Sequence, residues 1–143
     1  MILEYCADVI ALYQGESPLC EPLVLVERLT EPKGYGLPGG RRDLIDGRLE
    51  SVLRCAVREF REETGLCLVP NGMLNIYDAP GRDPRGPKIS TVVHGRAYGR
   101  LRSEAGKTRA FLMESAQIDR FRDRFVFDHY QMLMDWRARS RNS

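Results

Sequence analysis

Long apolar runs, paired cysteines and a surplus of one charge are all missing from this sequence. No apolar stretch approaches the roughly 20 residues that a membrane-spanning helix needs, so we expect no membrane partner. The net charge of the 143 residues is only +2, which gives no support for nucleic-acid binding. Hydrophobic residues make up 43% and charged residues 29%. This balance excludes extended disorder and fits a single domain of residues 1–143.

Paired cysteines and lysine are both scarce. The four cysteines form no CxxC pair and have no interleaved histidine, which favours free thiols in a reducing cytoplasm over a disulfide or a metal site. The N-terminus carries Glu4 and Asp8 and no basic segment, which makes it a poor signal peptide. The 22 basic residues comprise 19 arginines and 3 lysines. Arginine suits bidentate contacts with phosphate or carboxylate, although a codon bias explains the excess equally well.

Hydrophobic periodicity predicts an α/β fold with a mixed sheet between helices. The C-terminal helix should turn Tyr130, Leu133, Met134 and Trp136 toward the core. The expected strands cover 7–13, 22–29, 66–70, 73–80, 89–101 and 108–113, and the expected helical segments are 115–120 and 128–139. Residues 31–47 hold five glycines and two prolines, which predicts a long loop.

The best-defined element is a helix from Ser51 to Thr64. Ser51 is a good N-cap residue and Gly65 a good C-terminal stop. The apolar residues recur at helical spacing, and Leu53, Val57 and Phe60 define the expected buried side.

Three carboxylates share one stripe of this helix. Glu59, Glu62 and Glu63 stand at positions i, i+3 and i+4, so they cover about 100° of the helix surface and border the core. Like charges at this spacing cost a few tenths of a kcal/mol each, and a hard divalent cation such as Mg²⁺ would offset that repulsion. The alternative is a solvated acidic face paired with neighbouring arginines, namely Arg54, Arg58 and Arg61.

The spacing around this stripe resembles the signature of the Nudix hydrolase family. Glu50 is followed by seven residues and then by Arg-Glu-Phe-x-Glu-Glu-x-Gly-Leu at 58–66, which matches the second half of the signature at every fixed position. The segment PKGYGLPGG at 32–40 also looks like the family's entry segment. The first half departs, because nine residues separate Gly40 from Glu50 instead of five. The loop at 41–49 is therefore four residues longer than usual.

The resemblance implies a Nudix-like α/β/α sandwich with a central mixed β-sheet. It also implies hydrolysis of a nucleoside diphosphate linked to another moiety, with Mg²⁺ or Mn²⁺ bridging the diphosphate and activating a water. Carried over residue by residue, the metal ligands are Glu59, Glu62 and Glu63. Arg58 should orient one of these carboxylates, or form only an ordinary helical pair with Glu62. Glu50 should hold the loop or a metal-bound water, and Gly39 and Gly40 should lie against the substrate.

Two further segments resemble the ADP-ribose pyrophosphatase branch of that family: RDPRG at 82–86 and FVFDHYQML at 125–133. Arg82 and Arg85 are suited to bind phosphate or ribose groups, while a plain charged turn is the structural alternative. Asp128 is predicted to be a helix N-cap, and His129 and His94 to be packing residues.

The general base is expected to be a carboxylate on a loop. Glu104, in the loop 102–107, resembles in position a loop glutamate of some ADP-ribose pyrophosphatases. The acidic pair common just before the next strand is replaced by Gly106 and Lys107. Glu114 and Glu59 are the alternatives.

The sequence thus predicts a cytoplasmic, metal-dependent pyrophosphatase that acts on ADP-ribose or a related nucleotide sugar or dinucleotide. A nucleoside-triphosphate pyrophosphatase is the nearest alternative. A sensor that binds ADP-ribose without cleaving it is another, although such sensors typically lose the carboxylates that this chain retains. The resemblance also implies a homodimer, since many proteins that resemble this chain form one.

Overall fold

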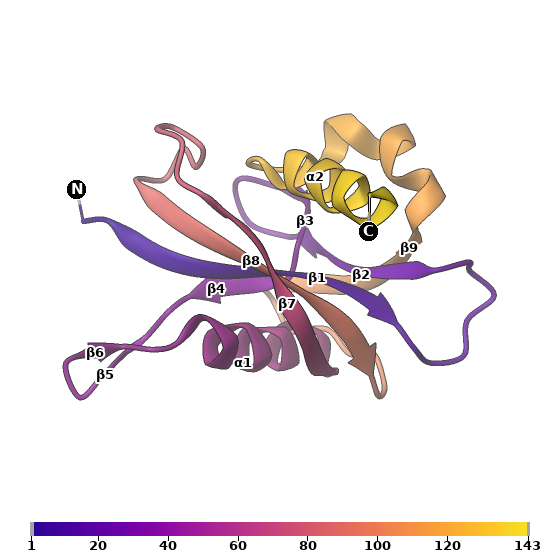
Figure 1. The fold of residues 1–143 in the computed structure, drawn as a ribbon, viewed down its shortest axis with the longest axis horizontal. Coiled ribbons are helices and arrows are strands. Elements are labelled where there is room, and N and C mark those ends of the chain that lie inside the picture. The colour runs from indigo at the N-terminus through magenta and orange to yellow at the C-terminus, as the bar shows by residue number, and fades with distance from the viewer. Residues whose placement is uncertain (1, 143) are drawn as a thin grey trace.

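A mixed β-sheet lies between two helical layers in the computed structural model, which describes residues 2–142 (Figure 1). The sheet order is β3-β2-β1-β8-β7, with β4 also paired to β1 and β9 to β2. β1 and β8 run parallel, and the other pairs are antiparallel. The strands of this sheet are β1 (Glu4–Tyr13), β2 (Pro22–Arg28), β3 (Gly34–Gly36), β4 (Gly39–Arg41), β7 (Cys67–Tyr77), β8 (Lys88–Tyr98) and β9 (Thr108–Glu114).

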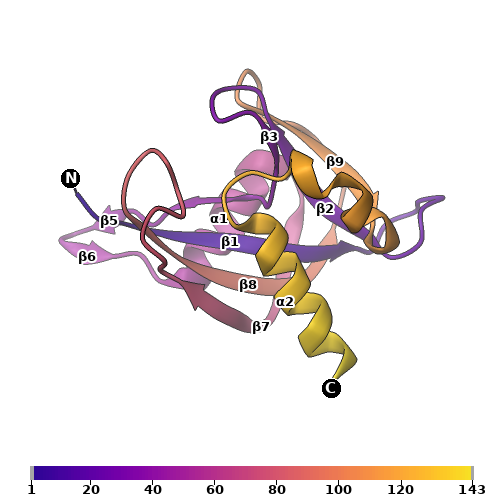
Figure 2. The same cartoon turned by 90° about the horizontal axis from the view of Figure 1, so that it is seen from above.

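The helix α1 (Val52–Thr64) covers one face of the sheet, and the 3₁₀ segment η1 (Ser115–Arg124) and the helix α2 (His129–Arg141) cover the other (Figures 1 and 2). The predicted α/β/α sandwich is therefore confirmed. No helix among residues 2–142 is long and apolar enough to span a membrane.

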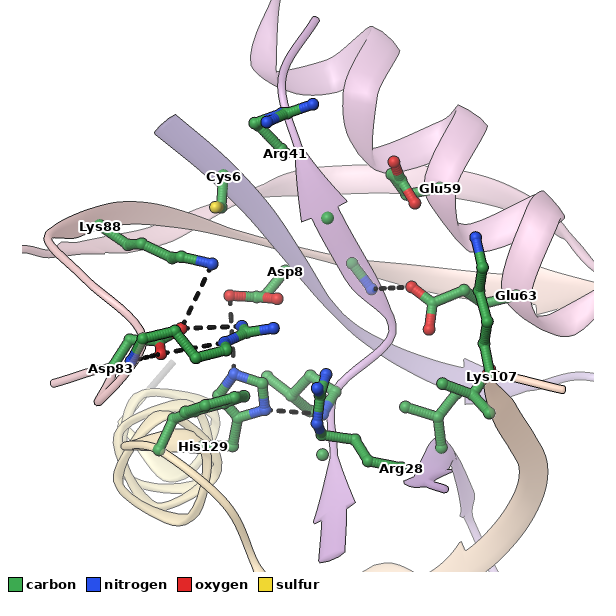
Figure 3. Close-up of a pocket in the computed structure, with 18 of the residues that line it drawn as sticks. Cys6, Asp8, Arg28, Arg41, Glu59, Glu63, Asp83, Lys88, Lys107 and His129 are labelled. Atoms are coloured by element: carbon green, nitrogen blue, oxygen red, sulfur yellow. Dashed lines mark hydrogen bonds and ion pairs between the residues drawn. The ribbon is translucent and has the colours of Figure 1, made fainter. Parts of the chain in front are cut away.

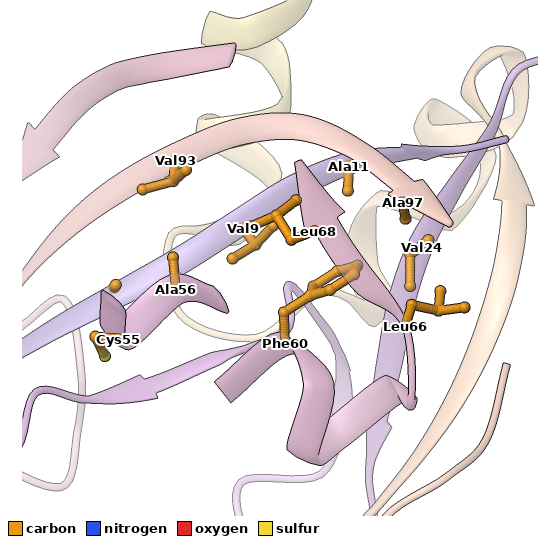
Figure 4. Close-up of a cluster of buried hydrophobic side chains, with 11 residues drawn as sticks. Val9, Ala11, Val24, Cys55, Ala56, Phe60, Leu66, Leu68, Val93 and Ala97 are labelled. Atoms are coloured by element: carbon orange, nitrogen blue, oxygen red, sulfur yellow. The ribbon is translucent and has the colours of Figure 1, made fainter. Parts of the chain in front are cut away.

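The central strand β1 supplies both halves of the hydrophobic core. Successive side chains of a strand point to opposite faces, so Val9 packs with Phe60 on the α1 side while Ile10 packs with Leu133 on the α2 side. Figure 4 shows Phe60 of α1 lying beneath the sheet among small apolar side chains.

The ends of α1 are those that the sequence predicts. The Ser51 hydroxyl accepts a hydrogen bond from the Arg54 N–H at 3.2 Å. Gly65 ends the helix in the left-handed conformation, with φ 73°, where a Cβ atom would be strained. Its N–H donates to the Arg61 carbonyl at 2.8 Å, which gives the helix a well-formed end.

The predicted buried side of α1 is wrong in part. Phe60 is buried, but Leu53 and Val57 are 43% and 36% exposed. The sheet instead covers the side that carries Cys55, Ala56 and Glu63. The acidic stripe therefore runs from this buried face, at Glu63, out to solvent, where the Glu62 side chain is 51% exposed.

Residues 31–47 are not the single loop that their glycines and prolines predict. They contain β3, β4 and β5 (Leu44–Ile45), and β5 forms a small hairpin with β6 (Arg48–Leu49), which follows directly. Asp46 and Gly47 have φ values of 51° and 77°, which suits the tight turn typical of two-residue hairpins. The four extra residues are thus accommodated by a hairpin beside α1.

Two other predictions need correction. The expected strands 66–70 and 73–80 form the single strand β7, interrupted by two register shifts. In α2, Leu133 is buried as predicted and Met132 is buried beside it, whereas Tyr130, Met134 and Trp136 are only partly buried.

Candidate functional site

A cavity of about 600 Å³ opens between the carboxylate face of α1, the strands β1 and β4, and the loop that leads into β8. Figure 3 places Glu59 and Glu63 on one side of it and Asp83 and Lys88 on the other. Eight of the ten predicted site residues line it: Gly39, Gly40, Glu59, Glu62, Glu63, Arg82, Arg85 and Glu104. The other two, Glu50 and Arg58, are not part of its lining.

Glu63 is the most unusual carboxylate of the cavity. Glu63 is only 7% exposed, and its Oε1 accepts a hydrogen bond from the Gly39 N–H at 3.0 Å. Burial raises the pKa of Glu63 to about 8, with further contributions from the charges of Glu59, Asp8 and Glu104. A cation beside this carboxyl would favour its ionised form.

Arg58 connects the other two carboxylates of the stripe. Its Nη1 donates to Glu59 at 2.9 Å and to Glu62 at 3.4 Å. Burial still raises the pKa of Glu59, against the effect of Arg58. Arg58 thus makes the predicted pair with Glu62, and it also makes a shorter contact with Glu59.

The donor set fits a hard divalent cation. Within residues 2–142, no three acidic, histidine or cysteine side chains are gathered as a ready-made metal site. Three carboxylates on one cavity wall nevertheless supply the oxygen donors that Mg²⁺ and Mn²⁺ prefer, and Mg²⁺ commonly takes waters and substrate phosphates as its remaining ligands. The raised pKa values of Glu59 and Glu63 indicate that a bound cation would relieve unfavourable charge.

Glu50 holds the chain rather than facing the cavity. Its side chain is 1% exposed and receives Arg58 as a fork, with Nε at 2.9 Å and Nη2 at 2.7 Å. It also accepts the Asp43 N–H at 3.1 Å. These hydrogen bonds, led by the one from Arg58, lower the pKa of Glu50 to about 2. Of the two roles open for Glu50, the geometry favours holding the loop, here the base of the hairpin.

The opposite wall of the cavity is basic and aromatic. The guanidinium groups of Arg28 and Arg85 lie 5.4 Å and 5.0 Å from the centre of the Phe127 ring. Lys88 lies 3.5 Å from Asp83, which also pairs with Arg85 at 2.8 Å. Lys88 and Arg85 thus share one carboxylate, and Arg28 lies beside them, which leaves positive charge for an anionic group of a ligand.

The two predicted substrate arginines differ in exposure. The Arg82 side chain is 5% exposed, and its Nε and Nη2 donate to the Asp128 carboxylate at 2.9 Å and 2.8 Å. Asp128 precedes α2 as predicted but makes no capping bond. This geometry favours a structural role for Arg82, which links the 78–87 loop to the start of α2. The Arg85 side chain, at 42% exposed, is the more accessible of the two.

Two glycines and a glutamate complete the predicted set. A Cβ atom on Gly40 would overlap the Glu59 carboxyl, and one on Gly39 would overlap Asp8. The absence of side chains therefore allows β4 to run close to the carboxylates. Glu104 lies in a turn, 31% exposed, with Lys107 Nζ at 3.4 Å, and its charge contributes to the raised pKa values of Glu59 and Glu63.

Several residues of the cavity escape the sequence analysis. Asp8 is a single acidic residue within an apolar strand, and two of the three lysines, Lys88 and Lys107, line the cavity. Both patterns are visible in the sequence. Phe127 gives no such signal, because its position depends on a positive φ of 55°, which is uncommon for a bulky residue.

Comparison with known proteins identifies the family. The sequence profile of the NUDIX domain matches residues 4–136. The chain belongs to the NUDIX family. It is 32% identical over 117 residues to the ADP-ribose pyrophosphatase of Methanocaldococcus jannaschii, a match that covers 80% of this chain and 64% of the relative. The chain therefore spans slightly less than two thirds of that protein's length.

Solved NUDIX structures show the same fold. The NUDIX domain of Shewanella oneidensis NrtR, solved with ADP ribose, superposes with a TM-score of 0.77 at 21% identity, covering 97% of this chain and 89% of that one. A bifunctional NMN adenylyltransferase/ADP ribose pyrophosphatase from Francisella tularensis, solved with AMP and a Mn ion, gives 0.75 at 22% identity and covers 93% and 40%. At these identities the likeness establishes the NUDIX fold.

Proposed function

We propose that this NUDIX protein is a metal-dependent pyrophosphatase that cleaves ADP-ribose, or a related nucleotide sugar or dinucleotide, at its diphosphate. The observation that carries the proposal is that an acidic wall and a basic wall face the same cavity. Glu59 and Glu63 provide cation-binding oxygens on one side, while Arg28, Arg85 and Lys88 provide positive charge on the other. A diphosphate between these walls would have metal-holding carboxylates on one side and cationic side chains on the other.

The chain's own residues support this chemistry in separate ways. Glu59, Glu62 and Glu63 would hold Mg²⁺ or Mn²⁺, which when bound neutralises the diphosphate and activates a water. The Gly39 N–H orients Glu63, and Arg58 orients Glu59. Glu104, which lines the same cavity, would accept the proton of the attacking water.

The comparisons favour ADP-ribose over other substrates. The archaeal relative is named an ADP-ribose pyrophosphatase, and one structural neighbour holds ADP ribose. A non-catalytic sensor is less favoured, because all three carboxylates of the stripe are present. A cytoplasmic location stays a prediction, supported by the four free cysteines. A homodimer also stays a prediction.

A substrate screen tests the proposal. The purified protein would be incubated with ADP-ribose, NADH, diadenosine polyphosphates, nucleotide sugars and nucleoside triphosphates, each with Mg²⁺ or Mn²⁺ and with EDTA as a control. We expect EDTA-sensitive conversion of ADP-ribose to AMP and ribose 5-phosphate. Release of pyrophosphate from triphosphates alone would instead establish the triphosphate pyrophosphatase. Tight ADP-ribose binding without any cleavage would establish the sensor.

The Glu104→Gln variant tests the general base. The amide cannot accept the water's proton, so we expect kcat for ADP-ribose to fall by about 10²-fold, as general-base catalysis typically contributes. Glu114→Gln serves as the matched control, because Glu114 lies outside the cavity lining and its carboxylate accepts the Cys20 N–H. Turnover by Glu104→Gln at the wild-type rate would remove Glu104 from the mechanism.

A further inference from the structure

His129 reaches from the start of α2 to the floor of the cavity (Figure 3). It is 5% exposed, and its Nδ1 accepts a hydrogen bond from the Leu37 N–H at 2.9 Å. An imidazole nitrogen that accepts carries no proton, so the proton of the ring lies on Nε2. Nε2 faces the Asp8 carboxylate at 3.7 Å. Burial lowers the pKa of His129, which is consistent with a neutral ring.

The neighbours of the ring keep it in this orientation. The Ser90 hydroxyl donates to the same Asp8 oxygen that faces Nε2, which fixes the carboxylate. The Phe127 ring packs edge-on against the imidazole, with centroids 5.3 Å apart. A Cβ atom on Gly36 would lie 3.0 Å from Nδ1. The absence of a side chain at Gly36 therefore allows the His129 ring to lie close to the backbone of β3.

Leu37 begins a short strip, residues 37–39, that leads to the carboxylate helix. The Leu37 N–H is held by His129, and the Pro38 carbonyl accepts the Val9 N–H at 2.8 Å. The Gly39 N–H then donates to Glu63 Oε1 at 3.0 Å. Pro38 has a fixed φ and no N–H of its own, so the strip is stiff and has few ways to adjust. A shift at Leu37 is therefore transmitted to the N–H group that contacts Glu63.

We infer that His129 is a positioning residue: its neutral Nδ1 fixes the strip 37–39 so that the Gly39 N–H holds Glu63 in the orientation that binds the metal. This inference rests on the proposed function. It assigns a role in the site to a residue that has no contact with the carboxylate stripe, through three hydrogen bonds and one stiff residue. Outer partners of this kind typically change metal affinity or activity by about 10–100-fold when they are replaced.

Two substitutions at this position separate the hydrogen bond from the packing. His129→Asn keeps an acceptor near the place of Nδ1, whereas His129→Leu keeps bulk without an acceptor. We expect His129→Leu to weaken Mn²⁺ binding by about 10-fold, measured by titration calorimetry without substrate, and to lower kcat while KM for ADP-ribose is unchanged. His129→Asn should restore most of both. If the Leu variant does not fold, His129→Gln replaces it, since its amide reaches toward Asp8 and not Leu37.

Tyr77→Phe is the control for a general loosening of α2. It removes the 2.6 Å hydrogen bond from Tyr77 to Asp135 of α2 without touching the strip, so Mn²⁺ affinity should be unchanged. Wild-type Mn²⁺ affinity in a folded His129→Leu variant would overturn the inference, and so would an equal loss in Tyr77→Phe. Failure of the proposed function is seen separately, as a wild-type protein that binds Mn²⁺ and does not cleave ADP-ribose.

Discussion

Replacement of Glu63 by Gln is expected to lower kcat for ADP-ribose by about 10³-fold, a typical upper effect of losing one preorganised electrostatic group, and at the same time to stabilise the metal-free protein. The loss of activity follows because the amide removes an anionic ligand from the cavity. The gain in stability follows because Glu63 is a buried carboxyl without a cation. Steady-state kinetics with Mg²⁺ and thermal melts in EDTA measure the two effects.

The stability difference has a predictable pH dependence. The pKa of Glu63 is raised in the folded protein from 4.5 to about 8, so the folded state keeps its proton over a range in which the unfolded state loses it. The stabilising contribution is then complete below about pH 4.5 and is lost as the pH rises through 8. Gln cannot ionise, so the stability advantage of the variant should grow between pH 5 and pH 8.

Added metal should reverse the order of stability. A cation that binds the folded wild-type protein raises its melting temperature by mass action, and the variant should gain less. Glu16→Gln is the matched control, since Glu16 lies exposed outside the cavity and should change neither activity nor stability. Wild-type kcat for Glu63→Gln, or a melting temperature below that of wild type in EDTA at pH 8, would contradict this account of the site.

The parts of the site that the sequence predicts are those encoded by local spacing. Ser51 and Gly65 define the ends of α1 through their own backbone preferences, and the i, i+3, i+4 spacing places three glutamates on one side of it. The face that the sheet covers depends on tertiary packing. Leu53 and Val57 follow the helical period and still lie exposed. The helix packs on the sheet through the side that carries the small residues Cys55 and Ala56, which allow its backbone to come close.

The basic wall of the cavity is assembled from distant segments, which is why the sequence reveals less of it. Arg28 ends β2, Lys88 begins β8, and Phe127 precedes α2. Nothing in their local spacing indicates that they meet. The RDPRG segment identifies Arg82 and Arg85 equally, yet only the fold shows that Arg82 is paired with Asp128 while Arg85 is more exposed.

Arg58→Ala is expected to destabilise the protein by about 3–5 kcal/mol, the cost of leaving one partner of a buried ion pair without the other. Arg58 makes two short hydrogen bonds to Glu50, whose side chain is 1% exposed. Arg54→Ala is the control, because Arg54 is 67% exposed and lies 3.9 Å from the same carboxylate; its loss should cost less than about 1 kcal/mol. Urea unfolding at pH 7 measures both.

The ion pair between Arg58 and Glu50 should also affect stability at acidic pH. The folded-state pKa of Glu50 is lowered from 4.5 to about 2, so its contribution to stability is present above about pH 4.5 and is lost as the pH falls toward 2. Arg58→Ala should therefore flatten the fall in stability below pH 4.5. Adding Glu50→Gln to Arg58→Ala should recover part of the loss, because the second change removes the buried charge that the first leaves unpaired. Strictly additive losses in the double variant would show that Arg58 acts mainly through its contacts with Glu59 and Glu62, and that the base of the hairpin is held by other means.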